Sequence, residues 1–371
     1  MGLPASGKTV VFNALSRSKV PVATYSTPSS EPNRAVVKVP DNRLTALSEM
    51  FQPQKVTPAE VQYVDVAGIT QGMSSDSQAA PLIARLRASD ALLIVVRAFA
   101  SEGVAHPLGS FDPERDLDVL ATEMMLADLG VVEKRLERLE KEQGRGKVTD
   151  AEKQAREREY KLLGDIRTAL GDGRLARSVE FTPDDEKLLR GFGFLTQKPW
   201  LIVLNTGDEG TDADLVGRVR ARWEDGDTPR TGGRSAQVIA VAGRLEMDLA
   251  ELSPEEATEF LEAWNVAESA LDRVIQHSYS LLDLISFFTV GEDEVRAWTV
   301  RRGATAPEAA GEIHTDLQKG FIRAEVTGYA DLTTLGGYAE VKAKGRLRLE
   351  GKEYVVADGD VLNIRFSPPA K

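Results

Sequence analysis

A glycine-rich segment at the start of the chain has the residue types and spacing of a phosphate-binding loop. It follows the pattern G-x-x-x-x-G-K-[ST] with Gly2, Leu3, Pro4, Ala5, Ser6, Gly7, Lys8 and Thr9. In such a loop, backbone N–H groups surround the phosphates, the lysine reaches the β and γ oxygens, and the next hydroxyl binds Mg²⁺. We therefore expect Lys8 and Thr9 to hold the phosphates and the metal of a nucleoside triphosphate. The plainer alternative is a glycine turn that precedes a surface helix.

A second set of candidates would complete the metal and γ-phosphate site. Asp65 stands near the end of the apolar run Val61 to Val66, where a carboxylate can hold Mg²⁺ through water. The backbone N–H of Gly68 follows closely and can sense the γ-phosphate. Ser29 is predicted to join Thr9 and Asp65 around the ion.

Two segments later in the chain are candidates for contacts with the base. Asn205, Thr206 and Asp208 directly follow an apolar run, which is where nucleotide switches read the base. Val241 and Ala242 follow the next apolar run, and their backbone groups are expected to close over the base. The order of these segments after the phosphate loop predicts a GTPase-like domain.

Composition narrows the class of protein. The 371 residues carry a formal net charge of −12 and contain no cysteine, which excludes disulfides, thiolate catalysis and zinc–cysteine sites. An acidic chain is not expected to bind nucleic acid over its whole surface, so we expect no DNA partner and only local basic patches. The longest apolar runs are too short to span a bilayer and no secretory signal is visible, so we expect no membrane partner and a cytoplasmic location.

Short β-branched runs alternate with helical segments, which predicts a doubly wound, mostly parallel α/β sheet. The predicted buried strands are Ala35 to Val39, Val61 to Val66, Ala91 to Val96, Leu201 to Leu204 and Val238 to Val241. In this fold a strand leads into the phosphate loop, but only Met1 precedes Gly2 in the sequence. We interpret the missing strand as the result of an incorrectly assigned start codon. A chain that truly lacked the strand is expected to be destabilised and poorly active.

The middle of the chain, from about Leu126 to Leu170, has the pattern of a coiled coil. Apolar residues recur there at spacings of three and four among charged residues, at Leu129, Val132, Leu136 and Leu139. A glycine-containing break follows, and a second charged stretch carries apolar residues at Ala151, Ala155, Leu162, Leu163, Ile166 and Leu170. The pattern predicts an antiparallel helical hairpin inserted into the α/β domain.

Beyond about Ser280 the chain changes to short apolar runs separated by Gly and Asp turns, which predicts a small β-rich domain. Within it, Lys342, Lys344, Arg346 and Arg348 alternate with apolar residues, so a strand would place four cations on one face. A phosphate backbone would relieve their repulsion, which makes them candidates for contact with RNA. The alternative is an ordinary solvated strand face.

Longer stretches of the chain resemble one family, the Obg-like ATPases known as YchF, which are TRAFAC-class P-loop NTPases. The matching segments are GLPASGKTVVFNAL, SEPNRAVVKVPDNRL, DVAGI, HPLGSFDPERDLDVL and LRLEGKEYVVADGDVLNIRF. The resemblance implies a P-loop G domain over residues 1–125 and 195–278, a helical coiled-coil insertion over 126–194, and a β-grasp-like α+β TGS domain over 279–371. It also implies hydrolysis of ATP more than of GTP, dependence on Mg²⁺, and a regulatory role at the ribosome.

The resemblance assigns two further residues and leaves other positions open. Ile69 stands where GTPases have a glutamine that orients the attacking water, and an isoleucine cannot position water. In the family a histidine of a mobile loop takes over this task, and His106 falls on its position. Phe99 falls where the family packs an aromatic ring beside adenine. The alternatives are a surface histidine without a task and a core phenylalanine. Ala5 replaces an asparagine that helps to bind potassium, so potassium dependence stays open.

Three functions remain open on the sequence alone. The first is a slow, Mg²⁺-dependent ATPase whose nucleotide state regulates association with the ribosome. The second is a GTPase of the same fold, supported by Asp208, whose carboxylate can accept hydrogen bonds from guanine, and opposed by Thr206, which replaces the lysine of guanine readers. The third is a nucleotide-binding scaffold with little or no turnover, supported by Ile69, by the altered switch segment at 73–81 and by the missing strand before the phosphate loop.

Overall fold

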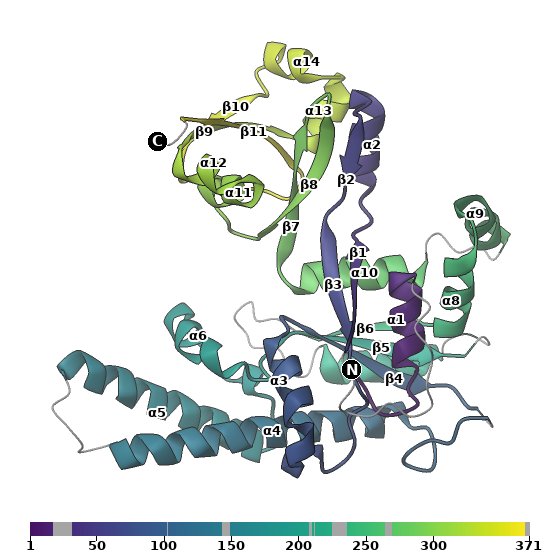
Figure 1. Ribbon diagram of the computed structural model, residues 1–371, viewed down its shortest axis with the longest axis vertical. Coiled ribbons are helices and arrows are strands. Elements are labelled where there is room, and N and C mark those ends of the chain that lie inside the picture. The colour runs from purple at the N-terminus through teal and green to yellow at the C-terminus, as the bar shows by residue number, and fades with distance from the viewer. Residues whose placement is uncertain are drawn as a thin grey trace. The chain divides into compact units, whose positions relative to one another are not determined.

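Two compact units make up the described part of this computed structural model. The structure describes residues 1–17, 32–101, 103–142, 149–207, 210, 212–224, 236–263 and 269–367. One unit contains residues 1–34 and 64–274, and the other contains residues 35–63 and 275–371 (Figure 1). Residues 35–63 thus group with the C-terminal residues, whereas the sequence-based boundaries left them in the G domain. No helix among the described ranges is long and apolar enough to cross a membrane.

The first unit is organised around three parallel strands in the order β4-β5-β6, in which Leu92 lies opposite Trp200 and Leu201 lies opposite Gln237. The strands are β4 (Leu92–Ala98), β5 (Trp200–Thr206) and β6 (Gln237–Val241). The helices are α1 (Lys8–Ser16), α3 (Ala80–Ala88), α4 (Pro113–Glu142), α5 (Asp150–Gly171), α6 (Pro183–Leu189), α7 (Ala213–Trp223), α8 (Gly243–Glu251) and α9 (Pro254–Ala263). The 3₁₀ helices are η1 (Met73–Ser75), η2 (Ser77–Ala79), η3 (Ala176–Ser178) and η4 (Arg190–Phe192). Each of these three strands begins and ends within two residues of the boundaries predicted from the sequence.

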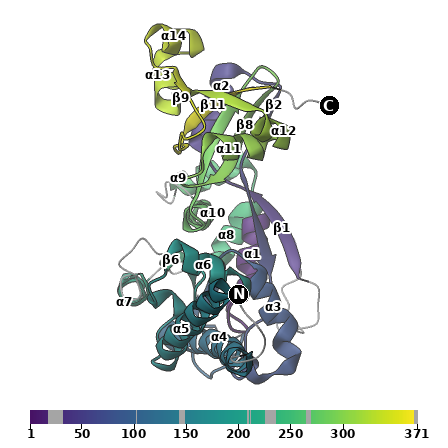
Figure 2. The same cartoon turned by 90° about the vertical axis from the view of Figure 1, so that its left-hand side faces the viewer.

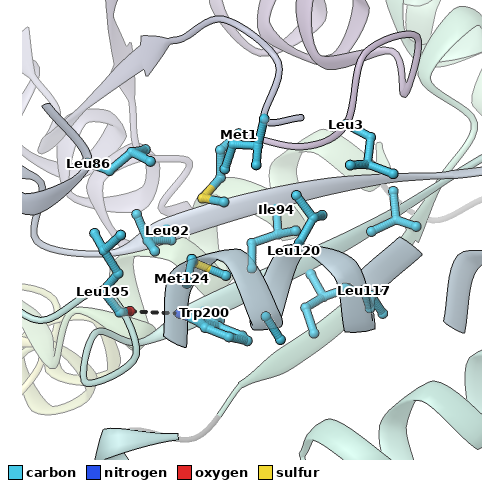
Figure 3. Close-up of a cluster of buried hydrophobic side chains, with 14 of the residues drawn as sticks. Met1, Leu3, Leu86, Leu92, Ile94, Leu117, Leu120, Met124, Leu195 and Trp200 are labelled. Carbon is cyan, nitrogen blue, oxygen red and sulfur yellow. Dashed lines mark hydrogen bonds between the residues drawn. The ribbon is translucent and has the colours of Figure 1, made fainter. Parts of the chain in front are cut away.

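Helices cover both faces of these strands. On one face, side chains of α3, α4 and α7 share a core with the strands, formed in part by Leu86, Leu92, Ile94, Leu117, Leu120, Met124, Trp200, Ile202 and Val219. Figure 3 shows this cluster, in which the Trp200 indole N–H donates to the Leu195 carbonyl oxygen over 3.1 Å. Helices α1 and α8 pack against each other and lie on the other side of the strands in Figure 1. This layering confirms the predicted α/β class.

The first two residues connect the phosphate loop to the sheet. Met1 donates from its nitrogen to Leu93 O over 2.7 Å and accepts from Val95 N over 2.8 Å, so its backbone runs beside β4. Gly2 O accepts from Ile69 N over 2.9 Å. The phosphate loop is therefore anchored on both sides before it turns into α1.

The helical hairpin predicted from the middle of the chain is present as α4 and α5. The two helices lie side by side in Figure 1 and are seen nearly end-on in Figure 2. Their seam buries Val132, Leu136, Leu139, Leu162, Leu163, Ile166 and Leu170, as predicted. Ala151 and Ala155 are exposed and do not belong to this seam. Helix α4 begins at Pro113, before the predicted insertion, because its first turns belong to the core of the strand layer.

Two strands that were predicted to be buried form a separate two-stranded ribbon instead. These are β1 (Asn33–Lys38) and β3 (Glu60–Asp65), in which exposed and more buried positions are mixed along each strand. A two-stranded ribbon without a helical layer on each face leaves part of its apolar surface in solvent, as at Val36 and Val64. The strands exist as predicted, but the prediction that both are fully buried is wrong.

The second unit contains a six-stranded sheet in the order β10-β9-β11-β7-β8-β2, with parallel pairs β11–β7 and β2–β8 among antiparallel ones. Its strands are β2 (Lys55–Thr57), β7 (Leu284–Val290), β8 (Glu294–Arg301), β9 (Phe321–Gly328), β10 (Arg348–Glu350) and β11 (Asp360–Phe366). Its helices are α2 (Asn42–Phe51), α11 (Ala306–Ile313), α12 (Thr315–Lys319), α13 (Tyr329–Leu335) and α14 (Tyr338–Ala343). Helix α10 (Ala270–Leu281) crosses the boundary between the units in sequence. The apolar face of α11 packs on the sheet through Ala306, Ala309 and Ala310, which gives the α+β layering expected of this domain.

One predicted strand of this unit is absent. The alternating segment around Lys342, Lys344 and Arg346 is not a strand, because α14 continues to Ala343 and a turn follows at Gly345, where φ is 68°. Only Arg348 lies in a strand, β10, and its guanidinium contacts Glu350, Asp360 and the Tyr354 hydroxyl. The prediction of four cations on one strand face is therefore wrong, although all four side chains are exposed.

Candidate functional site

The phosphate loop owes its shape to close backbone approaches at two glycines. A Cβ atom on Gly2 would lie 2.2 Å from Val95 O, and one on Gly7 would lie 2.0 Å from the Asn205 Nδ2 atom. Gly7 also has a φ of 88°, which is left-handed backbone that favours glycine. Helix α1 begins at the next residue, Lys8, so its N-terminal N–H groups face the loop.

The lysine of the loop is folded back onto the loop itself. Lys8 donates from Nζ to the Leu3 carbonyl oxygen over 2.8 Å. Burial lowers the pKa of the Lys8 amine to about 8, and the nearby Asp65 carboxylate opposes that shift. A bound polyphosphate would supply the charge that this partly desolvated cation lacks.

Two predicted metal ligands face each other beside this lysine. Thr9 Oγ1 donates to Asp65 Oδ2 over 3.1 Å, although the two residues are far apart in the sequence. A hydroxyl and a carboxylate oxygen at this separation suit Mg²⁺, which prefers oxygen ligands and keeps several waters and substrate phosphates around it. The third predicted ligand, Ser29, lies outside the described residues. No cluster of three or more His, Cys, Asp or Glu side chains with metal-site geometry occurs within the described ranges.

Gly68 lies directly against the phosphate loop, as its predicted role requires. A Cβ atom at this position would be 2.9 Å from Pro4 N and 3.2 Å from Lys8 Nζ. The next residue, Ile69, points its fully buried side chain into the core of the first unit. The residue that replaces the glutamine of GTPases is therefore turned away from solvent and has no polar group to orient water.

Asn205 braces two segments that were assigned to different parts of the site. Its Nδ2 donates to Ser6 O over 3.0 Å, and its Oδ1 accepts from Gly243 N over 3.1 Å. Both amide atoms are thus used within the protein, so a contact between Asn205 and the base stays a prediction. The neighbouring Val241 is buried at the end of β6, and Ala242 joins β6 to α8.

The base-side candidates gather near the end of β5. Phe99 lies close to Gly207, because a Cβ on Gly207 would be 3.4 Å from the Phe99 Cβ atom. The Phe99 ring stacks on the Arg97 guanidinium, whose Cζ lies 4.8 Å from the ring centroid. Thr206 is buried, and its hydroxyl has no partner among the described residues. Asp208 lies outside the described residues.

His106 is held by two hydrogen bonds rather than exposed on a loop. Its Nε2 lies 2.8 Å from Asp116 Oδ2, and its Nδ1 accepts from Leu108 N over 3.1 Å. The His106 side chain is only 4% exposed. His106 is thus not the surface side chain that the alternative expected, and its catalytic role stays a prediction.

Sequence reasoning missed three buried polar residues around these loops. Arg97 donates to the carbonyl oxygens of Phe99 and Val104, Asp116 contacts His106, and Glu123 accepts from the N–H groups of Gly72 and Ser74. In the sequence, these three residues could have been recognised as charged side chains that stand among apolar residues of β4 and α4. Such residues are rarely fully buried without a partner, which is the clue that was available.

The exposed cations near α14 remain a loose group. Lys342, Lys344 and Arg346 have no ion pair within the part of the chain that the structure describes, whereas Arg348 is paired with acids of its own unit. The first three side chains follow the C-terminal end of α14 and its turn. Of the four cations predicted to share a strand face, these three are thus available to an outside anion in the part of the chain that the structure describes.

Comparisons with known proteins agree with this arrangement. Residues 1–123 match the family MMR_HSR1, described as "50S ribosome-binding GTPase", and residues 284–367 match YchF-GTPase_C, described as "Protein of unknown function (DUF933)". The chain is 41% identical to the ribosome-binding ATPase YchF of Bacillus subtilis, over 99% of this chain and 98% of that protein. It is 34% identical to the Obg-like ATPase 1 of Gallus gallus, over 100% of this chain and 92% of that protein. The solved structure of the Schizosaccharomyces pombe YchF GTPase matches with a TM-score of 0.83 and 30% identity, covering 98% of this chain and 96% of that one. The fold of that YchF GTPase, which includes a P-loop GTPase domain, is therefore shared along nearly the whole chain.

Proposed function

Because the chain belongs to the YchF family, we propose that it is a Mg²⁺-dependent nucleoside triphosphatase that prefers ATP to GTP and regulates translation at the ribosome. The observation that carries the proposal is the approach of Thr9 to Asp65, 3.1 Å apart, beside the partly desolvated Lys8 amine. In this proposal Lys8 binds the β and γ oxygens, and Thr9 and Asp65 hold the metal. Gly68 donates its N–H to the γ-phosphate, and His106 accepts the proton of the attacking water.

Turnover separates an enzyme from the alternative of a nucleotide-binding scaffold. Two observations favour the scaffold: the buried Ile69 side chain, and the use of both His106 ring nitrogens in hydrogen bonds. Purified protein, with and without ribosomes, should release phosphate from ATP faster than a Lys8→Ala control. Equal rates would favour the scaffold. Chelation of Mg²⁺ should abolish the difference between the two proteins.

The preference for ATP rests on the base side of the site. Thr206 is too short to pack its side chain along a nucleotide as the lysine of guanine readers does, and Phe99 beside Gly207 offers an aromatic surface. We expect ATP to bind more tightly than GTP by less than tenfold, or about 1.4 kcal/mol. Calorimetric titration with non-hydrolysable analogues measures this. Tighter GTP binding that is abolished by Asp208→Ala would favour the GTPase instead.

Contact with ribosomal RNA is proposed for the exposed cations Lys342, Lys344 and Arg346. Because they have no ion pair in the described residues, their charge is available to phosphate groups, and Arg348 is proposed only as a supporting side chain of the same surface. Replacing the three by Ala should weaken ribosome binding and make its dependence on salt less steep. Ala variants of Lys319 and Arg301, exposed cations on other elements of the same unit, are the matched control. An unchanged salt dependence in the triple variant would remove RNA contact from this surface.

A further inference from the structure

We propose that Asp116 is a positioning residue for the hydrolytic reaction, which holds the His106 imidazole so that Nδ1 is its basic nitrogen. The inference rests on the proposed function, because it gives His106 a partner within the same reaction. Sequence reasoning singled out the histidine alone. The acid that belongs to it lies in the first turn of α4, beyond a proline that starts the helix.

The hydrogen bonds of His106 identify which ring nitrogen carries the proton. Leu108 contributes a backbone N–H, which can only donate, and it points to Nδ1 over 3.1 Å. Nδ1 therefore presents its lone pair. The proton of the neutral ring must then be on Nε2, which donates to the Asp116 carboxylate over 2.8 Å. The two side chains are only 4% and 3% exposed, so water does not compete for this bond.

The Asp116 carboxylate is itself fixed from several sides. Its Oδ1 accepts from the Nε and Nη2 atoms of Arg115, and its backbone N donates to Asp112 O over 2.9 Å. Leu117, the next residue, is part of the buried core of the first unit. The acid thus stands on the well-packed start of a long helix, where it can hold a loop histidine in one orientation.

The loop that carries His106 is held at its other end by a second charged group. Arg97 on β4 donates to Phe99 O over 3.1 Å and to Val104 O over 2.9 Å. His106 therefore sits between an arginine that binds the loop backbone and a carboxylate that binds its ring.

Within the proposed function, this arrangement assigns the proton to a particular nitrogen of His106. In the hydrolytic step the water oxygen bonds to the γ-phosphorus, while the bond from that phosphorus to the bridging oxygen breaks and the nucleoside diphosphate leaves with the electron pair. The proton of the water passes to His106 Nδ1, which requires that the Leu108 N–H has first released this nitrogen. The Asp116 carboxylate then faces an imidazolium and stabilises it, as a carboxylate does in hydrolytic triads.

The test combines kinetics with the tautomer of the ring. An Asp116→Asn side chain can donate to Nε2, which would move the ring proton to Nδ1. We expect kcat for ATP to fall by about tenfold to a hundredfold, with unchanged affinity for a non-hydrolysable analogue. In a His106→Ala background the same substitution should have no further effect on kcat. Asp118→Asn, which changes a partly exposed acid of the same helix that pairs with Arg222, is the control and should leave kcat unchanged.

A second measurement does not depend on turnover. The chain has three histidines, so ¹⁵N spectra of the rings can be assigned with the His106→Ala variant. At a pH where the ring is neutral, we expect the Nε2–H tautomer in the unmodified protein and loss of that tautomer in Asp116→Asn. A wild-type ring protonated on Nδ1 would overturn the inference.

The kinetic outcomes separate this inference from the proposed function. Effects of Asp116→Asn and His106→Ala that multiply would overturn the positioning role alone, since the two residues would then act independently. The same holds for an Asp116→Asn protein that keeps full kcat while His106→Ala is slow. If His106→Ala is as fast as the unmodified protein, both the proposed base and its partner are wrong.

Discussion

The Asn205 side-chain amide donates to the Ser6 backbone oxygen over 3.0 Å and so ties the end of β5 to the phosphate loop. The same side chain accepts from Gly243 N at the start of α8. A residue that sequence patterns assign to base recognition thus also holds together three segments of the site. The close fit explains why position 7 requires glycine, since a Cβ atom on Gly7 would collide with the Asn205 amide.

Replacement of Asn205 by Ala should therefore lower both stability and nucleotide affinity. It leaves the buried Gly243 N–H without its acceptor, which costs about 1–3 kcal/mol of unfolding free energy. Urea unfolding and calorimetric titration measure the two effects. Asn363→Ala, which removes an exposed amide, is the control and should change stability by less than about 0.5 kcal/mol. A control-sized effect at Asn205 would show that this brace contributes little.

Glu123 should be required to hold the segment from Gly72 to Ser74 in its ordered conformation. Its buried carboxylate on α4 accepts from Gly72 N over 2.6 Å and from Ser74 N over 3.0 Å, at the start of η1. We expect Glu123→Ala to cost about 1–3 kcal/mol of stability and to speed amide exchange at Gly72 and Ser74. Glu133→Ala, at an exposed position of the same helix, provides the comparison. Unaltered exchange at both amides would contradict the prediction.

Nucleotide binding should take up a proton at Lys8 in mildly alkaline solution. The pKa of Lys8 is lowered to about 8 by burial, against the ordinary value of 10.5, and the bound phosphates should raise it again. Affinity for ATP is therefore expected to fall as the pH rises through this range, because the free protein must first regain the proton.

The same pKa shift has the opposite effect on the stability of the free protein. The unfolded chain binds the Lys8 proton more strongly than the folded chain, so the penalty for a buried ammonium is fully present below about pH 8 and disappears towards pH 10. Titrations near pH 9, about midway in this window, in buffers with different ionisation enthalpies measure the proton uptake. Lys8→Arg is the control, because arginine stays charged and should take up none. Equal uptake by both proteins would assign the proton to another group.

Ala5→Asn should stabilise the loop and introduce sensitivity to potassium. Ala5 has a φ of 60°, a left-handed conformation that asparagine adopts more readily than alanine, so the variant should gain about 1 kcal/mol or less. The new amide oxygen also provides a cation ligand. Phosphate release in potassium and in sodium should differ only in this variant. Ala5→Gly relieves the same backbone strain without a ligand, and stimulation by potassium there would sink the argument.

The predicted strands and the helical hairpin show where local pattern is sufficient. Leu201 to Leu204 is continuously apolar, as suits a strand covered on both faces, and the seam from Val132 to Leu139 is apolar at the helical period; both are buried where expected. The strand predicted around Lys342 was wrong because it rested on local pattern alone. Alternation over a few residues resembles a strand, but α14 and its glycine turn take up this segment, and its exposed cations give no packing signal to tell the two apart.

By itself, the sequence determined that a phosphate loop and the candidates for a metal-binding acid and a base-side segment follow one another along a P-loop chain. Those features depend on local residue types, such as Gly7 at a positive φ and Lys8 at the start of a helix. Only the tertiary structure decided which distant groups meet: Asn205 with Ser6, Glu123 with Gly72, and His106 with the acid of the next helix. Hydrogen bonds between separate segments leave no period in the sequence, because their geometry depends on how the strands and α4 pack around one core.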